Sequence, residues 1–240
     1  MSHSGLLSVI DDVTRKLVPN PCSVVRENPH PGQGTVLVLG TPRGGTSAVA
    51  GICHVLGVPM GVDLDRSNVE DRLFHEMLAS SEITHSMQSY FADVTAEKQL
   101  VGVKNPVMID RLPEFYGCIP NPLLVVVSRD VFATAQREEC SGEMFITGLR
   151  AAIRRKYAIL EFVESVKDPL IVVSYERLLS DPGAAAEALC QFIHGQINPR
   201  LIELVSTLVR PNADMPDDVD FVEARERYER QMSSGVLSVA

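Results

Sequence analysis

One glycine-rich segment combines the residue types needed to bind an anion. It reads Val36-Leu-Val-Leu-Gly-Thr-Pro-Arg-Gly-Gly-Thr-Ser47, an apolar run followed by a loop with three glycines. Glycines let backbone amides approach an anion closely, and a helix N-terminus adds roughly half a positive charge. We therefore predict a strand, a phosphate-binding loop and a helix capped by Thr46 or Ser47.

The spacing of this loop is similar to Gly-x-x-x-x-Gly-Lys-Ser/Thr of nucleotide triphosphatases, but Thr46 occupies the lysine position. Without that lysine, ATP or GTP hydrolysis lacks a central part. The cation stands earlier, at Arg43, and hydroxyls follow at Thr46 and Ser47, which suits a 5′-phosphate whose transferable group points towards Arg43. The alternative is a glycine turn that begins a helix and binds nothing.

Three further polar side chains directly follow apolar runs. Lys104 follows Val101–Val103, Arg129 follows 123–128 and Tyr175 follows 170–174. Because ligands of parallel sheets bind beyond the carboxyl ends of the strands, these residues are candidates for the same site. The alternatives are a solvated lysine, an arginine in a surface ion pair and a tyrosine of the core.

The elements that would position these residues alternate between strand and helix patterns. Continuous apolar runs at 35–39, 100–103, 123–127 and 170–173 are typical of strands buried on both faces. Helical spacing at 46–56, 145–166 and 184–193 separates and follows them. We predict an α/β fold, a three-layer sandwich with a central parallel β-sheet flanked by helices.

The stretch Gly40–Gly61 resembles the nucleotide-binding loop and first helix of bacterial sulfotransferases that use 3′-phosphoadenosine-5′-phosphosulfate (PAPS). The resemblance covers roughly residues 35–182 and implies the P-loop-like fold of that family. It extends to Lys104-Asn-Pro106, to the strand ending in Arg129, to Leu170–Pro182, and to Asp63–Phe74 with its glutamate before a helix.

The resemblance implies sulfuryl transfer from PAPS to a hydroxyl or amine, without a metal. Arg43 and Lys104 would stabilise the developing negative charge, and Glu70, or else Asp71, would be the general base. The residues that the resemblance implies for donor binding are Arg43, Gly44, Gly45, Thr46 and Ser47 at the 5′-phosphosulfate, Arg129 and Arg137 at the 3′-phosphate, and Tyr175 at the adenine. Glu70 and Asp71 could instead be carboxylates that stabilise a helix start.

Two other functions remain open. One is an ATP-dependent small-molecule or nucleotide kinase on the same fold, disfavoured by Thr46. The other is a catalytically inactive nucleotide-binding module, suggested by Gly44, Val131 and Arg137 where the family has serine, proline and serine. His75-Glu76 begins like a zinc-protease sequence, but Ala79 replaces the second histidine, so we expect no metal site there.

Composition narrows the partners. The 240 residues carry a net charge of −9, which argues against a general nucleic-acid binder. Five scattered cysteines suit a reducing compartment, and the lack of long apolar stretches predicts no transmembrane segment and a cytoplasmic location. The acceptor, a small molecule, lipid or carbohydrate, is not specified, and a homodimer is allowed.

The predicted organisation has three parts. Residues 1–34 form an N-terminal helix at 5–18 and a loose lead-in rich in proline and glycine, and residues 35–210 form the α/β domain. Residues 211–240 form an acidic loop and an exposed, charged helical tail.

Overall fold

The computed structural model describes residues 20–96, 98–136, 142–209 and 219–234. The predicted helix at 5–18, Arg137 and most of the acidic loop lie outside the described residues. The strands are β1 (Cys22–Arg26), β2 (Gly34–Leu39), β3 (Leu64–Asp65), β4 (Glu70–Asp71), β5 (Leu100–Lys104), β6 (Pro122–Ser128) and β7 (Leu170–Ser174). The α-helices are α2 (Thr46–Val55), α3 (Arg72–Leu78), α4 (Ile83–Thr95), α5 (Leu112–Phe115), α6 (Val131–Gln136), α7 (Glu143–Ser165), α8 (Tyr175–Ser180), α9 (Pro182–His194), α10 (Pro199–Leu208) and α11 (Phe221–Ser233).

The main sheet has five strands in the order β1-β7-β6-β2-β5. Strands β5, β2, β6 and β7 are mutually parallel, so all four carboxyl ends lie at one edge of the sheet. These are the four strands that the continuous apolar runs predict, and their positions are confirmed.

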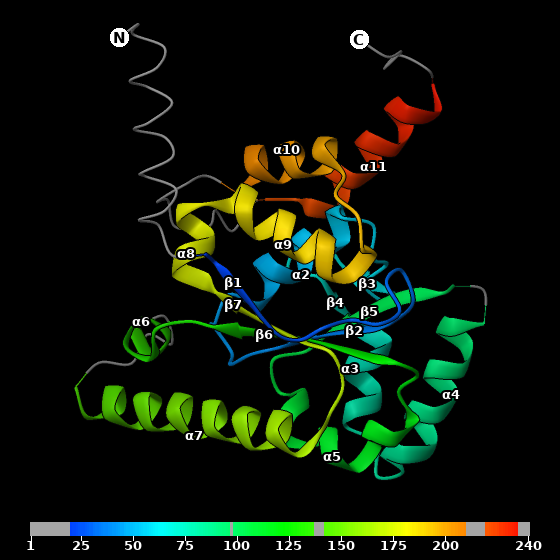
Figure 1. The fold of residues 1–240 in the computed structure, drawn as a ribbon. Coiled ribbons are helices and arrows are strands. Elements are labelled where there is room, and N and C mark those ends of the chain that lie inside the picture. Colours follow the sequence, from blue (N-terminus) through cyan, green and yellow to red (C-terminus); the bar gives the residue numbers. More distant parts are fainter. Residues whose placement is uncertain (1–19, 97, 137–141, 210–218, 235–240) are drawn as a thin grey trace, which may run out of the picture.

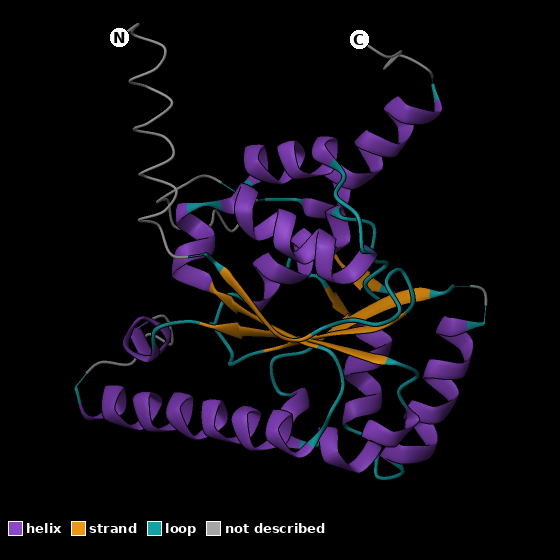
Figure 2. Cartoon of the chain, viewed as in Figure 1, coloured by secondary structure: helices purple, strands orange, loops and turns teal. Residues whose placement is uncertain are grey.

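Helices cover both faces of the sheet, which makes three layers (Figures 1 and 2). One apolar core contains Val36 and Val38 of β2 with residues of α2, α9, α10 and α11. The other contains Leu37 and Leu39 with residues of α3, α4, α5 and α7. Successive side chains of a strand point to opposite faces, so an unbroken apolar run supplies both cores. The predicted α/β sandwich is confirmed.

The lead-in predicted as loose contains a strand. β1 pairs antiparallel with β7, from Cys22 opposite Val173 to Arg26 opposite Leu170. β1 is an edge strand in which Cys22 is buried and the next three residues are exposed, so it has no continuous apolar run. That pattern is why the sequence did not reveal it.

The C-terminal helix is also less exposed than predicted. Phe221 and Val222, at the start of α11, are buried, and the Phe221 ring packs on Gly51 of α2, where a Cβ would lie 2.3 Å from the ring. Most charged residues of α11 are at least partly exposed, although Arg225 donates to the Val55 carbonyl, and their number obscures this short apolar anchor in the sequence. None of the described helices is long and apolar enough to cross a membrane.

Candidate functional site

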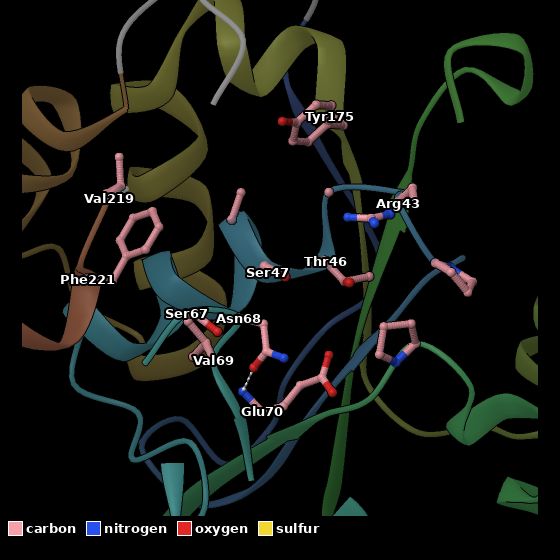
Figure 3. Close-up of a pocket in the computed structure, with 14 residues that line it drawn as sticks. Arg43, Thr46, Ser47, Ser67, Asn68, Val69, Glu70, Tyr175, Val219 and Phe221 are labelled. Carbon is pink, nitrogen blue, oxygen red and sulfur yellow. Dashed lines mark hydrogen bonds between the residues drawn. The ribbon is translucent and has the colours of Figure 1, made fainter. Parts of the chain in front are cut away.

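The predicted site residues meet at the carboxyl edge of the parallel sheet. The loop with Arg43 follows β2, Lys104 ends β5, Arg129 follows β6 and Tyr175 follows β7. A cavity of about 490 Å³ lies there, lined by the loop after β2, the first turn of α2, Glu70 and Tyr175 (Figure 3). Its volume is in the range of small-molecule sites.

The loop between β2 and α2 ends in a left-handed residue. Gly45 has φ +84° and is the N-cap of α2, and no side chain caps this helix. The predicted cap at Thr46 or Ser47 is therefore wrong, because both residues already lie inside the helix. Without a side-chain cap, the first amides of α2 are free to donate to an anion.

Two glycines of this loop are required by their surroundings. A Cβ on Gly44 would lie 2.6 Å from the Thr41 carbonyl oxygen, which accepts a hydrogen bond from the Gly44 amide. A Cβ on Gly45 would lie 2.1 Å from the Tyr175 ring. Glycine at 44 therefore fits the tight turn made here.

Lys104, Glu70 and Ser47 form a polar cluster beneath the cavity. The Lys104 Nζ donates to Glu70 Oε1 at 2.6 Å and to Ser47 Oγ at 3.0 Å. The Lys104 side chain is only 1% exposed and that of Glu70 18%. Burial lowers the pKa of Lys104 below its ordinary value, and the Glu70 carboxylate partly offsets this effect. A buried lysine thus joins the end of β5 to the first turn of α2 and to β4.

The structure separates the two candidate carboxylates. Asp71 is 2% exposed, caps α3 by accepting from the Leu73 and Phe74 amides, and accepts from the Val62 amide and the Tyr90 hydroxyl. Its oxygens are committed to these contacts, so Asp71 has the helix-capping role. Glu70 instead lines the cavity.

The turn before Glu70 holds a strained backbone. Val69 has φ +57°, which is a genuine outlier for a β-branched residue, and it is buried. The Asn68 side chain accepts a hydrogen bond from the Glu70 amide at 3.0 Å (Figure 3). Strain of this kind costs about 1–3 kcal/mol and clusters at functional sites, which fits a role for the Glu70 carboxylate in the cavity.

Arg129 is buried behind the loop. It is 8% exposed, its guanidinium donates to the Arg43 carbonyl at 3.0 Å, and it lies 4.7 Å from the Tyr175 ring centroid. Its Nε is buried and has no hydrogen-bond partner. The ammonium of Lys156 on α7 donates to the Arg129 carbonyl. Arg129 thus holds the loop in place through the Arg43 carbonyl, and its Nε is a buried donor that remains available to a ligand.

Arg43 and Tyr175 both contact Arg129 but differ in exposure. Arg43 is exposed on the loop with φ +56° and lines the cavity, whereas Tyr175 is 2% exposed and packs on Gly45. The structure brings together Arg43, Gly45, Thr46, Ser47, Glu70, Lys104, Arg129 and Tyr175. Their roles in binding and catalysis, like that of the undescribed Arg137, stay predictions.

Sequence reasoning missed the part of the cavity wall that lies at the start of α11. Ser67, Asn68 and Val69 of the β3–β4 turn line the cavity together with Val219 and Phe221 near the start of α11. The only signal in the sequence was the apolar pair Phe221-Val222 before a charged helix.

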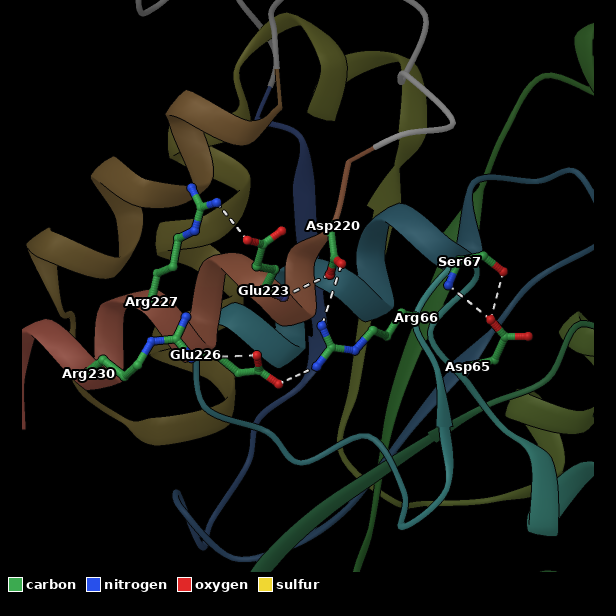
Figure 4. A network of polar contacts seen from close by, with 8 residues as sticks. All are labelled: Asp65, Arg66, Ser67, Asp220, Glu223, Glu226, Arg227 and Arg230. Carbon is green, nitrogen blue, oxygen red and sulfur yellow. Dashed lines mark hydrogen bonds and ion pairs between the residues drawn. The ribbon is translucent and has the colours of Figure 1, made fainter.

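An ion-pair network ties these two segments together (Figure 4). Arg66, in the β3–β4 turn, lies 2.5 Å from Glu226 and 3.8 Å from Asp220 of the α11 segment. Phe221 follows Asp220 directly, so Arg66 links the turn before Glu70 to the apolar wall.

His75 serves a structural contact. Its Nδ1 lies 2.9 Å from the Asn105 side-chain nitrogen, a hydrogen bond that supports the loop after Lys104. Within the described residues, no group of three or more histidine, cysteine, aspartate or glutamate side chains has an arrangement that could hold a metal ion.

The chain is similar to solved structures with which it shares low sequence identity. No protein-family model matches it, and no curated protein sequence matches. It is similar to a solved sulfotransferase domain of the Synechococcus PCC 7002 olefin synthase, at 16% identity and a TM-score of 0.47 over 85% of this chain and 98% of that one. It is also similar to the sulfotransferase domain from the curacin biosynthetic pathway. The sequence identity is 15% and the TM-score 0.48, over 85% of this chain and 99% of that one.

A third solved structure is retinol dehydratase in a complex with retinol and PAP, at 14% identity and a TM-score of 0.43 over 80% of this chain and 69% of that one. The strand order and pairing by themselves show that the chain is an α/β protein with a mostly parallel five-stranded sheet.

Proposed function

We propose that this protein transfers the sulfuryl group of PAPS to a hydroxyl or amine of a small-molecule, lipid or carbohydrate acceptor. The observation that carries the proposal is the Lys104–Glu70–Ser47 cluster at the uncapped start of α2. It joins a buried cation, a carboxylate facing the cavity and the free amides of a helix in one place.

The residues present fit a donor with two anionic ends. The amides of Thr46, Ser47 and Ala48 open α2 without a side-chain cap and suit the 5′-phosphosulfate, together with the exposed Arg43. Arg129, with its buried and unpartnered Nε, suits the 3′-phosphate, because guanidinium binds phosphate with several donors. When bound, PAPS would supply an activated sulfuryl group.

In this proposal Glu70 is the general base for the acceptor. Its Oε1 accepts from Lys104, while its Oε2 takes no hydrogen bond from another described residue and can accept the acceptor's proton. Lys104 pairs with the Glu70 carboxylate and places positive charge where the transferred group develops negative charge. Arg43 adds a second positive charge from the loop.

The donor-binding part is tested by calorimetry with adenosine 3′,5′-bisphosphate, with and without magnesium. We expect binding without magnesium, and at least ten-fold weaker binding by Arg43→Ala and by Arg129→Ala, about 1.4 kcal/mol each. Arg227→Ala is the matched control, because that arginine is exposed on α11 and pairs only with the exposed Glu223. Magnesium-dependent binding of ATP in place of the bisphosphate would support the kinase and refute the proposal.

The catalytic part is tested with radiolabelled PAPS and a panel of sugars, lipids and phenols. Glu70→Gln should lower labelling of the acceptor by about 10²–10⁴-fold, the contribution of a general base. Glu76→Gln, at an exposed carboxylate on α3, is the control and should leave labelling unchanged. Bisphosphate binding without turnover of any acceptor would identify a binding module and refute the transferase.

We also propose a cytoplasmic location. Support comes from the cysteines: the four in the described part of the chain, Cys22, Cys53, Cys118 and Cys190, are all unpaired, which suits a reducing compartment.

A further inference from the structure

The long helix α7 carries an apolar stripe on its outer face. Ile146, Ile153, Tyr157 and Leu160 are 54%, 50%, 62% and 55% exposed. At 100° per residue they fall within one narrow sector of the helix. The opposite face holds Ile159, Phe162 and Val163, which are buried in the core beneath the sheet. The stripe is therefore additional to the face that anchors the helix.

The helix lies at the edge of its layer, with its outer side turned away from the sheet (Figure 1). Single exposed apolar residues are ordinary, whereas an aligned series on one helix is typical of a contact surface.

Charged side chains beside the stripe are arranged in two blocks. Arg150 and Arg154 lie in the first half of the exposed face, and Glu161 and Glu164 lie near its end. None of these four side chains forms an ion pair with another described residue. The blocks are unfavourable within one helix, because like charges are spaced at i,i+4 and i,i+3 and because a carboxylate in the last turn opposes the helix dipole.

The same charges become favourable when a second copy packs antiparallel. Counted from Tyr157, Arg150 is seven residues before and Glu164 seven after, while Arg154 is three before and Glu161 four after. A two-fold axis near Tyr157 therefore places each arginine opposite a glutamate of the other copy.

The apolar residues follow the same symmetry. Ile153 is four residues before Tyr157 and Leu160 three after, so each would face the other across the axis. An isologous interface requires such self-complementarity. The four charges also sum to zero, which does not favour an anionic membrane or a nucleic acid.

We propose that a second copy of this chain binds here, forming a homodimer through antiparallel packing of α7 against α7. The partner contacts are Ile153 with Leu160, Tyr157 with Tyr157 across the axis, Arg154 with Glu161, and Arg150 with Glu164. A pair of single helices is a small interface, below about 1,200 Å², so its dissociation constant is micromolar.

Sedimentation equilibrium on the full chain tests this proposal. The wild type should be a dimer at about 100 µM and dissociate on dilution, with a micromolar constant. Leu160→Glu should weaken association at least ten-fold, whereas Ile197→Glu, at an exposed residue before α10, is the control and should not. Circular dichroism checks that each variant is folded. A monomeric wild type, or a dimer unaffected by Leu160→Glu, would overturn the proposal.

A charge exchange tests the antiparallel register. Arg154→Glu and Glu161→Arg should each weaken self-association, roughly ten-fold, because each creates two repulsive pairs in the symmetric dimer. A mixture of the two variants should form heterodimers, since both cross-pairs are then attractive, and the double variant should associate like the wild type. Failure of the mixture to associate would exclude this register and overturn the proposal.

Discussion

Removing either partner of the Lys104–Glu70 ion pair should destabilise the protein, but by unequal amounts. At 2.6 Å and an effective dielectric constant of 20, the attraction between the two charges is about 6 kcal/mol. Desolvation of Lys104, whose side chain is 1% exposed, offsets much of it. The two losses of stability differ because the charge that remains after each substitution is buried to a different extent.

Glu70→Ala leaves an ammonium with only the Ser47 hydroxyl as acceptor, and we expect a loss of about 3–4 kcal/mol of unfolding free energy. Lys104→Met leaves a carboxylate that is 18% exposed and can rehydrate in the cavity, so the loss should be about 1–2 kcal/mol. The double variant should cost less than the sum of the two, because neither charge remains unpaired.

The pH dependence provides a second check. Burial already lowers the pKa of Lys104 in the folded protein, and removing Glu70, which raises it, should lower it further. The unfolded chain then binds the proton more tightly than the folded one, so stability rises with pH until the ordinary lysine pKa near 10.4. The defect of Glu70→Ala should therefore shrink as the pH rises towards about 10.

Urea unfolding of the four proteins at several pH values measures these quantities. The exposed pair of Arg227 and Glu223 is the control, and its double-variant cycle should give a coupling below about 1 kcal/mol. Additive losses at the Lys104–Glu70 pair, or a larger loss for Lys104→Met than for Glu70→Ala, would refute this account of the cluster.

Three other perturbations have definite outcomes. Gly45→Ala forces an alanine to φ +84° against the Tyr175 ring, so urea unfolding should show a loss of about 2 kcal/mol or more, and an unchanged midpoint would contradict the packing. Arg66→Ala removes exposed ion pairs and should lower the unfolding free energy by less than about 1 kcal/mol. It should nevertheless speed amide hydrogen exchange in the turn 65–70, and exchange rates equal to those of the wild type would show that the link to α11 does not hold the turn. Burial lowers the pKa values of His54 and His194 in the folded protein, so the unfolded state binds more protons on acidification. The unfolding free energy should therefore fall below about pH 6.5, by up to roughly 2.7 kcal/mol per pH unit for the two histidines together. His54→Asn combined with His194→Gln should flatten that fall; a wild type with no loss of stability down to about pH 5 would contradict it.

The sheet could be predicted because its strands are buried on both faces. The runs at β2, β5, β6 and β7 are rich in consecutive apolar residues, which is a local property of the sequence. β1 could not be found in this way, since its stability comes from hydrogen bonds to β7 about 150 residues later in the chain. The burial of α11 likewise depends on a partner, Gly51 of α2.

The candidate site also has a part that could be predicted from the sequence and a part that could not. Residue type and order predict Arg43, Lys104 and Arg129 at one edge of the sheet, because each cation lies at or after the end of a predicted strand. The choice between Glu70 and Asp71 needs the structure, since adjacent carboxylates before a helix have the same pattern and only their partners differ. The wall formed by the β3–β4 turn and α11 joins segments far apart in the chain, which no local pattern encodes.

The cations of the site can bind an anion without giving up their internal contacts. An ammonium has three N–H donors, and Lys104 uses two, to Glu70 and Ser47. A guanidinium has five, and Arg129 directs one at the Arg43 carbonyl while its Nε has no partner. The internal contacts of Lys104 and Arg129 thus leave some of their N–H donors available for an anion. Glu70 and Asp65 act on Lys104 as negative charges, so these free donors, and not a net positive charge, would hold an anion within a chain of net charge −9. A small anion with several oxygens is therefore attracted to this cavity, whereas an extended polyanion would meet the acidic remainder of the chain.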